Sequence, residues 1–145
     1  MVDDLYQETI LDHSKRPRNF RSMDDANRKA EGYNPLCGDK LKLFLRVEDD
    51  IVKEASFIGA GCAISTASAS LMTESLKGKN RAEALKLLDE FHELLTTDAE
   101  AGKDLGKLMV FCGVREYPAR VKCATLAWHT LRSALNDTGE TASTE

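Results

Sequence analysis

Residues 41–58, LKLFLRVEDDIVKEASFI, carry the clearest strand pattern in the chain. This stretch contains two runs of apolar or alternating residues, 41–47 and 51–58, which are separated by three acidic residues. In the first run every second side chain is apolar, and this alternation is typical of a strand with one buried face. The stretch therefore predicts a β-hairpin that turns at residues 48–50.

Two loops flank the predicted hairpin, and both carry side chains that bind metals. The loop before it contains Cys37 and Asp39, and the loop after it contains Cys62. Because the outer ends of an antiparallel pair lie side by side, these three side chains can meet. Gly38 allows a turn between Cys37 and Asp39, so that both side chains can point at one ion.

A third cysteine of this kind, Cys123, completes a set of three thiolates and one carboxylate. Such a set suits a borderline-soft divalent ion such as zinc, which takes four ligands tetrahedrally. We expect Cys62 and Cys123 near the starts of two helices, where the positive end of the helix dipole favours negative sulfur. The sequence thus predicts a metal or sulfur site built from Cys37, Asp39, Cys62 and Cys123.

Other uses of the four cysteines stay open at this point. They could form two disulfides, as in small secreted domains, or could be separate buried thiols. Residues 1–13 contain neither the basic nor the apolar segment of a signal peptide, which favours reduced thiols in a cytoplasm. Cys112 ends the apolar run 108–112, and we interpret it as a core residue.

The remaining elements are predicted from apolar spacing and from signals at their ends. Pro17 ends the first helix, and Gly78 follows the second. Asn80 and Glu83 form a capping box for the third helix, and Pro118 begins the last. The expected segments are helices at 2–13, 63–77, 81–95 and 118–135, an edge strand at 28–33, and a disordered tail at 136–145.

Serine and histidine residues are interpreted as packing or surface residues. The helix at 63–77 is rich in Ala and Ser, and small side chains let a helix lie close to a sheet. No base accompanies its serines, so we expect no serine chemistry. His13, His92 and His129 are expected to pack or face solvent rather than bind the metal.

Composition excludes several classes of protein. A chain of 145 residues with 42% hydrophobic content fits one domain, expected at residues 1–135, with a core of its own. A net charge of −4 and the lack of a basic stripe disfavour nucleic acid as a partner. The longest apolar runs are far shorter than the roughly 20 residues that span a bilayer. We therefore expect a protein that binds neither nucleic acid nor membrane.

Five motifs form a composite that is more specific than any one of them. They are Tyr6-x-Glu8-x-Ile10-Leu11-Asp12-His13, Pro17-Arg18-Asn19-Phe20, Asn34-Pro35-x-Cys37-Gly38-Asp39, Gly59-x-Gly61-Cys62-Ala63-Ile64-Ser65, and Cys123-Ala124 in a Trp-bearing helix. Together they resemble the IscU/SufU family of iron–sulfur cluster assembly proteins. The resemblance extends from about residue 5 to residue 135.

Two departures from the IscU pattern make the sequence resemble the SufU branch more closely. IscU-type proteins carry a histidine directly before the third cysteine of the site, whereas this chain has Lys122. The segment between Cys62 and Cys123 is also longer than in IscU, and the extra residues are expected within 96–117.

The resemblance implies an α+β fold, in which a small antiparallel three-stranded sheet packs against helices. It also implies a zinc ion held by Cys37, Asp39, Cys62 and Cys123. SufU-type proteins are zinc-dependent sulfurtransferases that act with a SufS-type cysteine desulfurase, a PLP enzyme. By similarity, a histidine of the partner replaces Cys37 on the zinc, and Cys37 becomes the catalytic acceptor that relays persulfide sulfur to downstream cluster assembly machinery.

Two alternatives from other classes stay open. The first is an IscU-like scaffold that assembles an iron–sulfur cluster on its cysteines instead of holding zinc. The second is an activator of the desulfurase with a purely structural zinc ion, in which case Cys37 would carry no persulfide.

Overall fold

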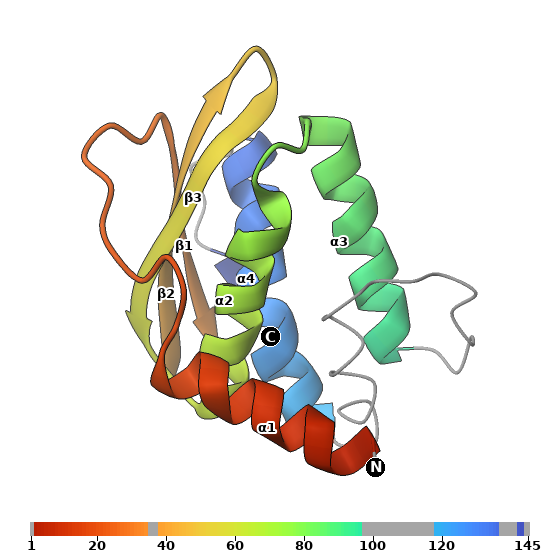
Figure 1. Cartoon of the computed structure of the whole chain (residues 1–145). Helices are drawn as coiled ribbons and strands as arrows, with labels where there is room; N and C mark the ends of the chain where they lie inside the picture. The colour runs from red at the N-terminus through yellow and green to blue at the C-terminus, as the bar shows by residue number, and fades with distance from the viewer. Residues whose placement is uncertain (1, 35–37, 97–117, 137–141, 144–145) are drawn as a thin grey trace.

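A sheet covered on one face by helices forms the body of the protein (Figure 1). The computed structural model describes residues 2–34, 38–96, 118–136 and 142–143. Helices α2 and α4 lie between the sheet and α3, and α1 crosses one end of the helical layer (Figure 1). The elements are α1 (Val2–Lys15), β1 (Arg28–Asn34), β2 (Asp39–Glu48), β3 (Ile51–Ala60), α2 (Ala63–Leu76), α3 (Arg81–Thr96), α4 (Pro118–Asn136) and β4 (Ala142–Ser143).

The central hairpin has the pairing that the sequence predicts. Strands β1, β2 and β3 are antiparallel neighbours, and β2 pairs with β3 from Lys40↔Ala60 to Glu48↔Ile51. At the turn, Asp49 and Asp50 have φ values of 51° and 65°. Positive φ at both central residues is typical of a two-residue turn whose twist matches that of the strands. The predicted α+β class with a three-stranded antiparallel sheet is confirmed.

The edge of the sheet contains one strand that the sequence did not predict. Strand β4 pairs in parallel with β1 through Gly32↔Ala142 and Tyr33↔Ser143, so the sheet order is β3-β2-β1-β4. These two residues belong to the expected disordered tail, and Asn136 ends α4. The other residues of that tail, 137–141 and 144–145, lie outside the described residues.

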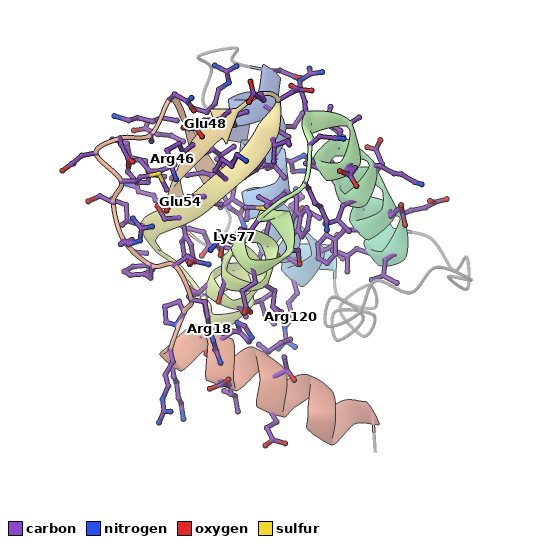
Figure 2. The ribbon with its side chains drawn as sticks, turned by 45° about the horizontal axis from the view of Figure 1, so that its top comes forward. Arg18, Arg46, Glu48, Glu54, Lys77 and Arg120 are labelled. Carbon is purple, nitrogen blue, oxygen red and sulfur yellow. The ribbon has the colours of Figure 1, made fainter. Side chains whose placement is uncertain are left out.

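Charged side chains stabilise the face of the sheet that points away from α2 and α4. Arg46 lies between Glu48 and Glu54 (Figure 2). Its guanidinium nitrogens are 3.4 Å from a Glu48 carboxylate oxygen and 3.5 Å from a Glu54 oxygen. Because Arg46 and Glu54 are opposite one another on β2 and β3, this pair reinforces the register of the hairpin.

Small residues allow α2 and α4 to approach each other and the sheet closely. Ser68 is fully buried on α2, where its hydroxyl donates to the Ala124 carbonyl and accepts a 3.1 Å bond from Trp128 Nε1. Trp128 in turn stacks on Phe91 of α3, with ring centroids 4.6 Å apart. Ser68 therefore joins two helices, in agreement with the predicted structural use of the serines.

Another serine on α2 holds α1 in place. His13 is 3% exposed, and its Nδ1 lies 2.7 Å from Ser70 Oγ. The same hydroxyl oxygen accepts a 2.8 Å bond from the Arg18 backbone N–H, directly after the predicted end of α1 at Pro17. His13 is thus a packed histidine, as expected.

The helix ends agree with the predicted signals. Asn80 Oδ1 accepts from the Glu83 N–H at 2.8 Å, and Glu83 accepts from the Asn80 N–H at 3.1 Å, so the capping box is formed. Gly78 follows α2 with a φ of +86°, a conformation that favours glycine.

One further prediction concerns residues 97–117. The core position of Cys112, at the end of the apolar run 108–112, lies outside the described residues. Within the described ranges, no helix has both the length and the apolar character needed to cross a bilayer.

The contact between β1 and α4 depends on a glycine. A Cβ atom on Gly32 would lie 2.1 Å from Thr130 Oγ1 and 3.1 Å from Leu126 Cδ1. We expect Gly32→Ala to lower the free energy of unfolding by about 1–3 kcal/mol, because overpacking forces neighbours to shift. Urea denaturation of the metal-free protein measures this change.

A double-mutant cycle with Thr130→Ala checks the cause. Removing the hydroxyl relieves the closest clash, so the cost of the double variant should be smaller than the sum of the single costs. Additive costs, or an unchanged stability of Gly32→Ala, would contradict the close approach of α4 to β1.

Candidate metal centre

Three of the predicted site residues converge at one end of the sheet. Asp39 begins β2, Cys62 directly precedes α2, and Cys123 lies in the second turn of α4. One carboxylate oxygen and the two sulfur atoms all lie within 4.8 Å of one another. Asp39 and Cys62 meet because they lie at the two outer ends of the hairpin, as the sequence predicted. Cys123 lies beside them because α4 packs on β1 and β2.

Asp39 lies at the centre of this group and is fully buried. Its Oδ1 accepts a 2.9 Å hydrogen bond from the Cys62 backbone N–H, and its Oδ2 accepts a 3.3 Å bond from Asn34 Nδ2. Oδ2 also lies 4.0 Å from Cys62 Sγ. The Cys62 N–H therefore holds Oδ1, and Oδ2 is the oxygen that lies beside the Cys62 sulfur.

Gly61 permits the close approach of the carboxylate to the chain before α2. A Cβ atom at this position would lie 2.7 Å from Asp39 Oδ1 and 3.1 Å from Asp39 Cγ. The glycine in the Gly61-Cys62 motif therefore makes room for the Asp39 carboxylate. The sequence showed this glycine, but only the structure shows what it accommodates.

Cys62 is the N-cap residue of α2. Its backbone is extended, with φ −71° and ψ 169°, and its sulfur accepts a 3.4 Å hydrogen bond from the Ser65 N–H. A backbone donor and the positive end of the helix dipole both favour negative charge on this sulfur. The predicted location of Cys62, immediately before a helix, is confirmed.

Cys123 is 3% exposed and faces the sheet from α4. Its sulfur lies 3.6 Å from Asn34 Nδ2. No disulfide joins Cys62 to Cys123 in the structure.

Asn34 is a residue of this site that the sequence analysis missed. It is fully buried, and its amide contacts both Asp39 and Cys123. From the sequence, Asn34 was identified only as the first residue of the Asn34-Pro35-x-Cys37-Gly38-Asp39 motif. A polar residue immediately before the cysteine loop was the available signal, but its burial depends on pairing with β2.

Cys37 lies outside the described residues, so its part in the site stays a prediction. The residues that bound its loop are at the site: Asn34 pairs with Asp39 across β1 and β2, and the Gly38 N–H donates to the Asn34 carbonyl at 2.8 Å. Gly38 has a φ of +72°, in agreement with the turn predicted there.

The donor set fits a zinc ion. Zinc binds thiolate sulfur at about 2.3 Å and carboxylate oxygen at about 2.0–2.2 Å, so two ligand atoms on one ion lie roughly 3.5–3.8 Å apart. The ligand atoms here lie within 4.8 Å of one another, so each pair would need to close by at most about 1.3 Å. Two cysteines and one aspartate would thus supply three ligands and leave the fourth position for another residue.

His129 belongs to a different environment. Its ring packs edge-on against His92 of α3, with ring centroids 6.0 Å apart. Burial, followed by the nearby His92 and Arg132, lowers the pKa of His129. His92 is exposed and His129 is half-buried, in agreement with the expectation that these residues pack or face solvent.

Comparison with known proteins agrees with this fold. The model of the NifU-like N terminal domain family matches residues 5–137. An iron–sulfur cluster assembly scaffold protein IscU from Streptococcus pyogenes serotype M1 is 39% identical over 92% of this chain and 84% of its own length. A zinc-dependent sulfurtransferase SufU from Bacillus subtilis is 40% identical over 92% of this chain and 91% of its own length.

Solved structures share the fold. A putative iron–sulfur cluster assembly scaffold protein for the SUF system from Fervidobacterium islandicum superposes with a TM-score of 0.85 and 36% identity, covering 91% of this chain and 97% of that one. The chain therefore belongs to the NifU-like N-terminal domain family, within the IscU and SufU group of iron–sulfur cluster assembly proteins.

Proposed function

We propose that this protein is a zinc-dependent sulfurtransferase in iron–sulfur cluster biogenesis, which accepts persulfide sulfur on Cys37. The observation that carries the proposal is the convergence of Asp39, Cys62 and Cys123 beside the loop of Cys37. The B. subtilis relative, named a zinc-dependent sulfurtransferase, supports it.

In this proposal Asp39, Cys62 and Cys123 hold the zinc ion throughout, and Cys37 is the exchangeable fourth ligand. When bound, the ion keeps a coordinated thiol deprotonated. A histidine of the partner would take the place of Cys37 as the fourth ligand. The Cys37 thiolate would then be free to act as a nucleophile. Asp39 suits such a site because replacing one sulfur with oxygen makes the ligand set less soft and easier to exchange.

The sulfur donor is a SufS-type cysteine desulfurase, a PLP enzyme that carries a persulfide on its own cysteine. The Cys37 thiolate attacks the outer sulfur of that persulfide. One S–S bond breaks, one S–S bond forms on Cys37, and the desulfurase thiolate leaves. The exchange needs no oxidant or reductant, and Cys37 then passes the sulfur to downstream assembly machinery.

The chemistry requires thiols that stay reduced between turnovers. We therefore propose a cytoplasmic location, where disulfides are rare. The absence of a disulfide between Cys62 and Cys123 is consistent with this location.

A second candidate is an IscU-like scaffold that assembles an iron–sulfur cluster on the same residues. Its support is that relatives from S. pyogenes and Thermotoga maritima, 39% and 41% identical, are named scaffold proteins. Anaerobic reconstitution with iron and sulfide distinguishes the two candidates. A stable cluster that passes to an apo-protein would favour the scaffold, whereas one equivalent of zinc in protein purified without added metal would favour the transferase.

The acceptor role of Cys37 predicts the effect of its removal. In Cys37→Ser, stimulation of the desulfurase should fall to the level without this protein, because no thiolate takes the sulfur. Mass spectrometry after incubation with desulfurase and cysteine should show persulfide on Cys37 of the parent and none on the variant.

Cys112→Ser is the matched control, because Cys112 is expected in the core. It should keep both metal and activity. Undiminished stimulation by Cys37→Ser would contradict the acceptor role. Stimulation without any persulfide on Cys37 of the parent would instead favour an activator with structural zinc.

The close packing of Gly61 against Asp39 predicts weaker metal binding in Gly61→Ala. The added methyl group would displace the carboxylate without removing a ligand, and disturbances next to metal ligands typically cost about 10–100-fold in affinity. Competition with a chromogenic chelator measures the zinc dissociation constant.

Gly78→Ala provides the control, because no atom lies within 4 Å of a Cβ atom added at Gly78, which has a φ of +86°. It should lower stability through backbone strain and leave zinc affinity unchanged. Equal zinc affinity of Gly61→Ala and the parent would show that Asp39 does not bind the metal from the position described.

A further inference from the structure

We propose that Asn34 is a positioning residue of the metal centre, which keeps Asp39 and Cys123 in place while the fourth ligand exchanges. The proposal rests on the proposed function, because it concerns the moment at which Cys37 leaves the zinc ion. It assigns a role to a side chain that is neither a ligand nor a sulfur acceptor.

The contacts of the Asn34 amide are the basis of this inference. Its Nδ2 lies 3.3 Å from Asp39 Oδ2 and 3.6 Å from Cys123 Sγ. An NH₂ group has two hydrogens, so one can be donated to the carboxylate and one to the sulfur. Asn34 thus links Asp39, a predicted oxygen ligand on β2, to Cys123, a predicted sulfur ligand on α4. Cys123 lies 89 residues after Asn34 in the chain.

The backbone of Asn34 is fixed by the sheet. Asn34 is the last residue of β1 and pairs with Asp39, and its carbonyl accepts the Gly38 N–H. On β1, Asn34 shares the buried face with Ala30 and Gly32, against which α4 packs. The amide is therefore held at the end of a paired strand and reaches the two predicted ligands from there.

Burial favours a polar function for this side chain over simple filling of space. Asn34 and Asp39 are fully buried, and Cys123 is 3% exposed. Placing an amide in such a position costs free energy unless it forms hydrogen bonds, and an apolar side chain of the same shape would avoid that cost. Asp39 Oδ2 and Cys123 Sγ, which accept from this amide, both belong to predicted zinc ligands.

Both carboxylate oxygens of Asp39 are held by donors on different elements. The Cys62 N–H holds Oδ1, and Asn34 holds Oδ2. A carboxylate fixed in this way binds an ion through one oxygen and cannot swing to add the second when another ligand leaves. Asn34 would thereby keep the fourth position open for the incoming ligand from the partner.

The test compares two substitutions of different shape. Asn34→Ala removes the donors and the volume, whereas Asn34→Leu removes the donors and keeps the branched shape. Each is made in the parent and in Cys37→Ala, and zinc affinity is measured by chelator competition. We expect both to weaken zinc about 10–100-fold in each background, the usual effect of removing a group that orients a ligand.

The visible spectrum of the Co²⁺-substituted protein gives a second readout, because it responds to the geometry of the ligands. Both Asn34 variants should change it. Asn27→Ala is the matched control, since Asn27 forms two side-chain hydrogen bonds with Val47, away from the site. It should leave zinc affinity and the Co²⁺ spectrum as in the parent.

A measurement on the unaltered sequence covers the case in which an Asn34 variant does not fold. With ¹¹³Cd²⁺ in place of zinc, NMR should show slow exchange of the Asn34 side-chain amide protons with solvent. It should also show scalar coupling between one of these protons and ¹¹³Cd through the Cys123 sulfur. Fast exchange without coupling would overturn the proposal. Parent-like zinc affinity in Asn34→Leu would also overturn it.

These outcomes separate the two proposals. Metal affinity and spectra do not require sulfur transfer, so absence of persulfide on Cys37 would leave the role of Asn34 intact. Conversely, normal zinc binding in Asn34→Leu with persulfide on Cys37 would leave the transferase intact.

Discussion

The arrangement of the site depends on the buried carboxylate of Asp39. A buried charge is costly unless it has partners, and Asp39 has a backbone donor from Cys62 and an amide donor from Asn34. These donors belong to the start of α2 and the end of β1. The same carboxylate thus connects the end of the sheet to the start of α2, so the fold itself places the three candidate ligands close together.

Features that depend on local sequence were predictable. The hairpin follows from alternation, its turn from consecutive acidic residues, and the start of α3 from the pair Asn80 and Glu83. Each is determined by residues within a few positions of one another. The convergence of Asp39 and Cys62 was also predictable, because antiparallel pairing alone brings the two ends of a hairpin together.

Features that depend on tertiary contacts were not predictable in the same way. The role of Asn34 arises from its register opposite Asp39 and from α4, and nothing in the local pattern shows that a residue before proline is buried. The attachment of α1 through His13 and Ser70 joins positions 57 residues apart. Strand β4 lies within a polar segment whose composition is typical of disorder.

The parallel pairing of β4 has a consequence for solubility during storage and expression. Exposed strand edges offer unpaired backbone groups that recruit other molecules and begin aggregation. Ala142 and Ser143 cover β1 at Gly32 and Tyr33, and the uncovered part of the strand carries Lys29 and Glu31. A terminal purification tag placed after residue 145 would extend directly from this protective segment, so an amino-terminal tag is the safer choice for handling the protein.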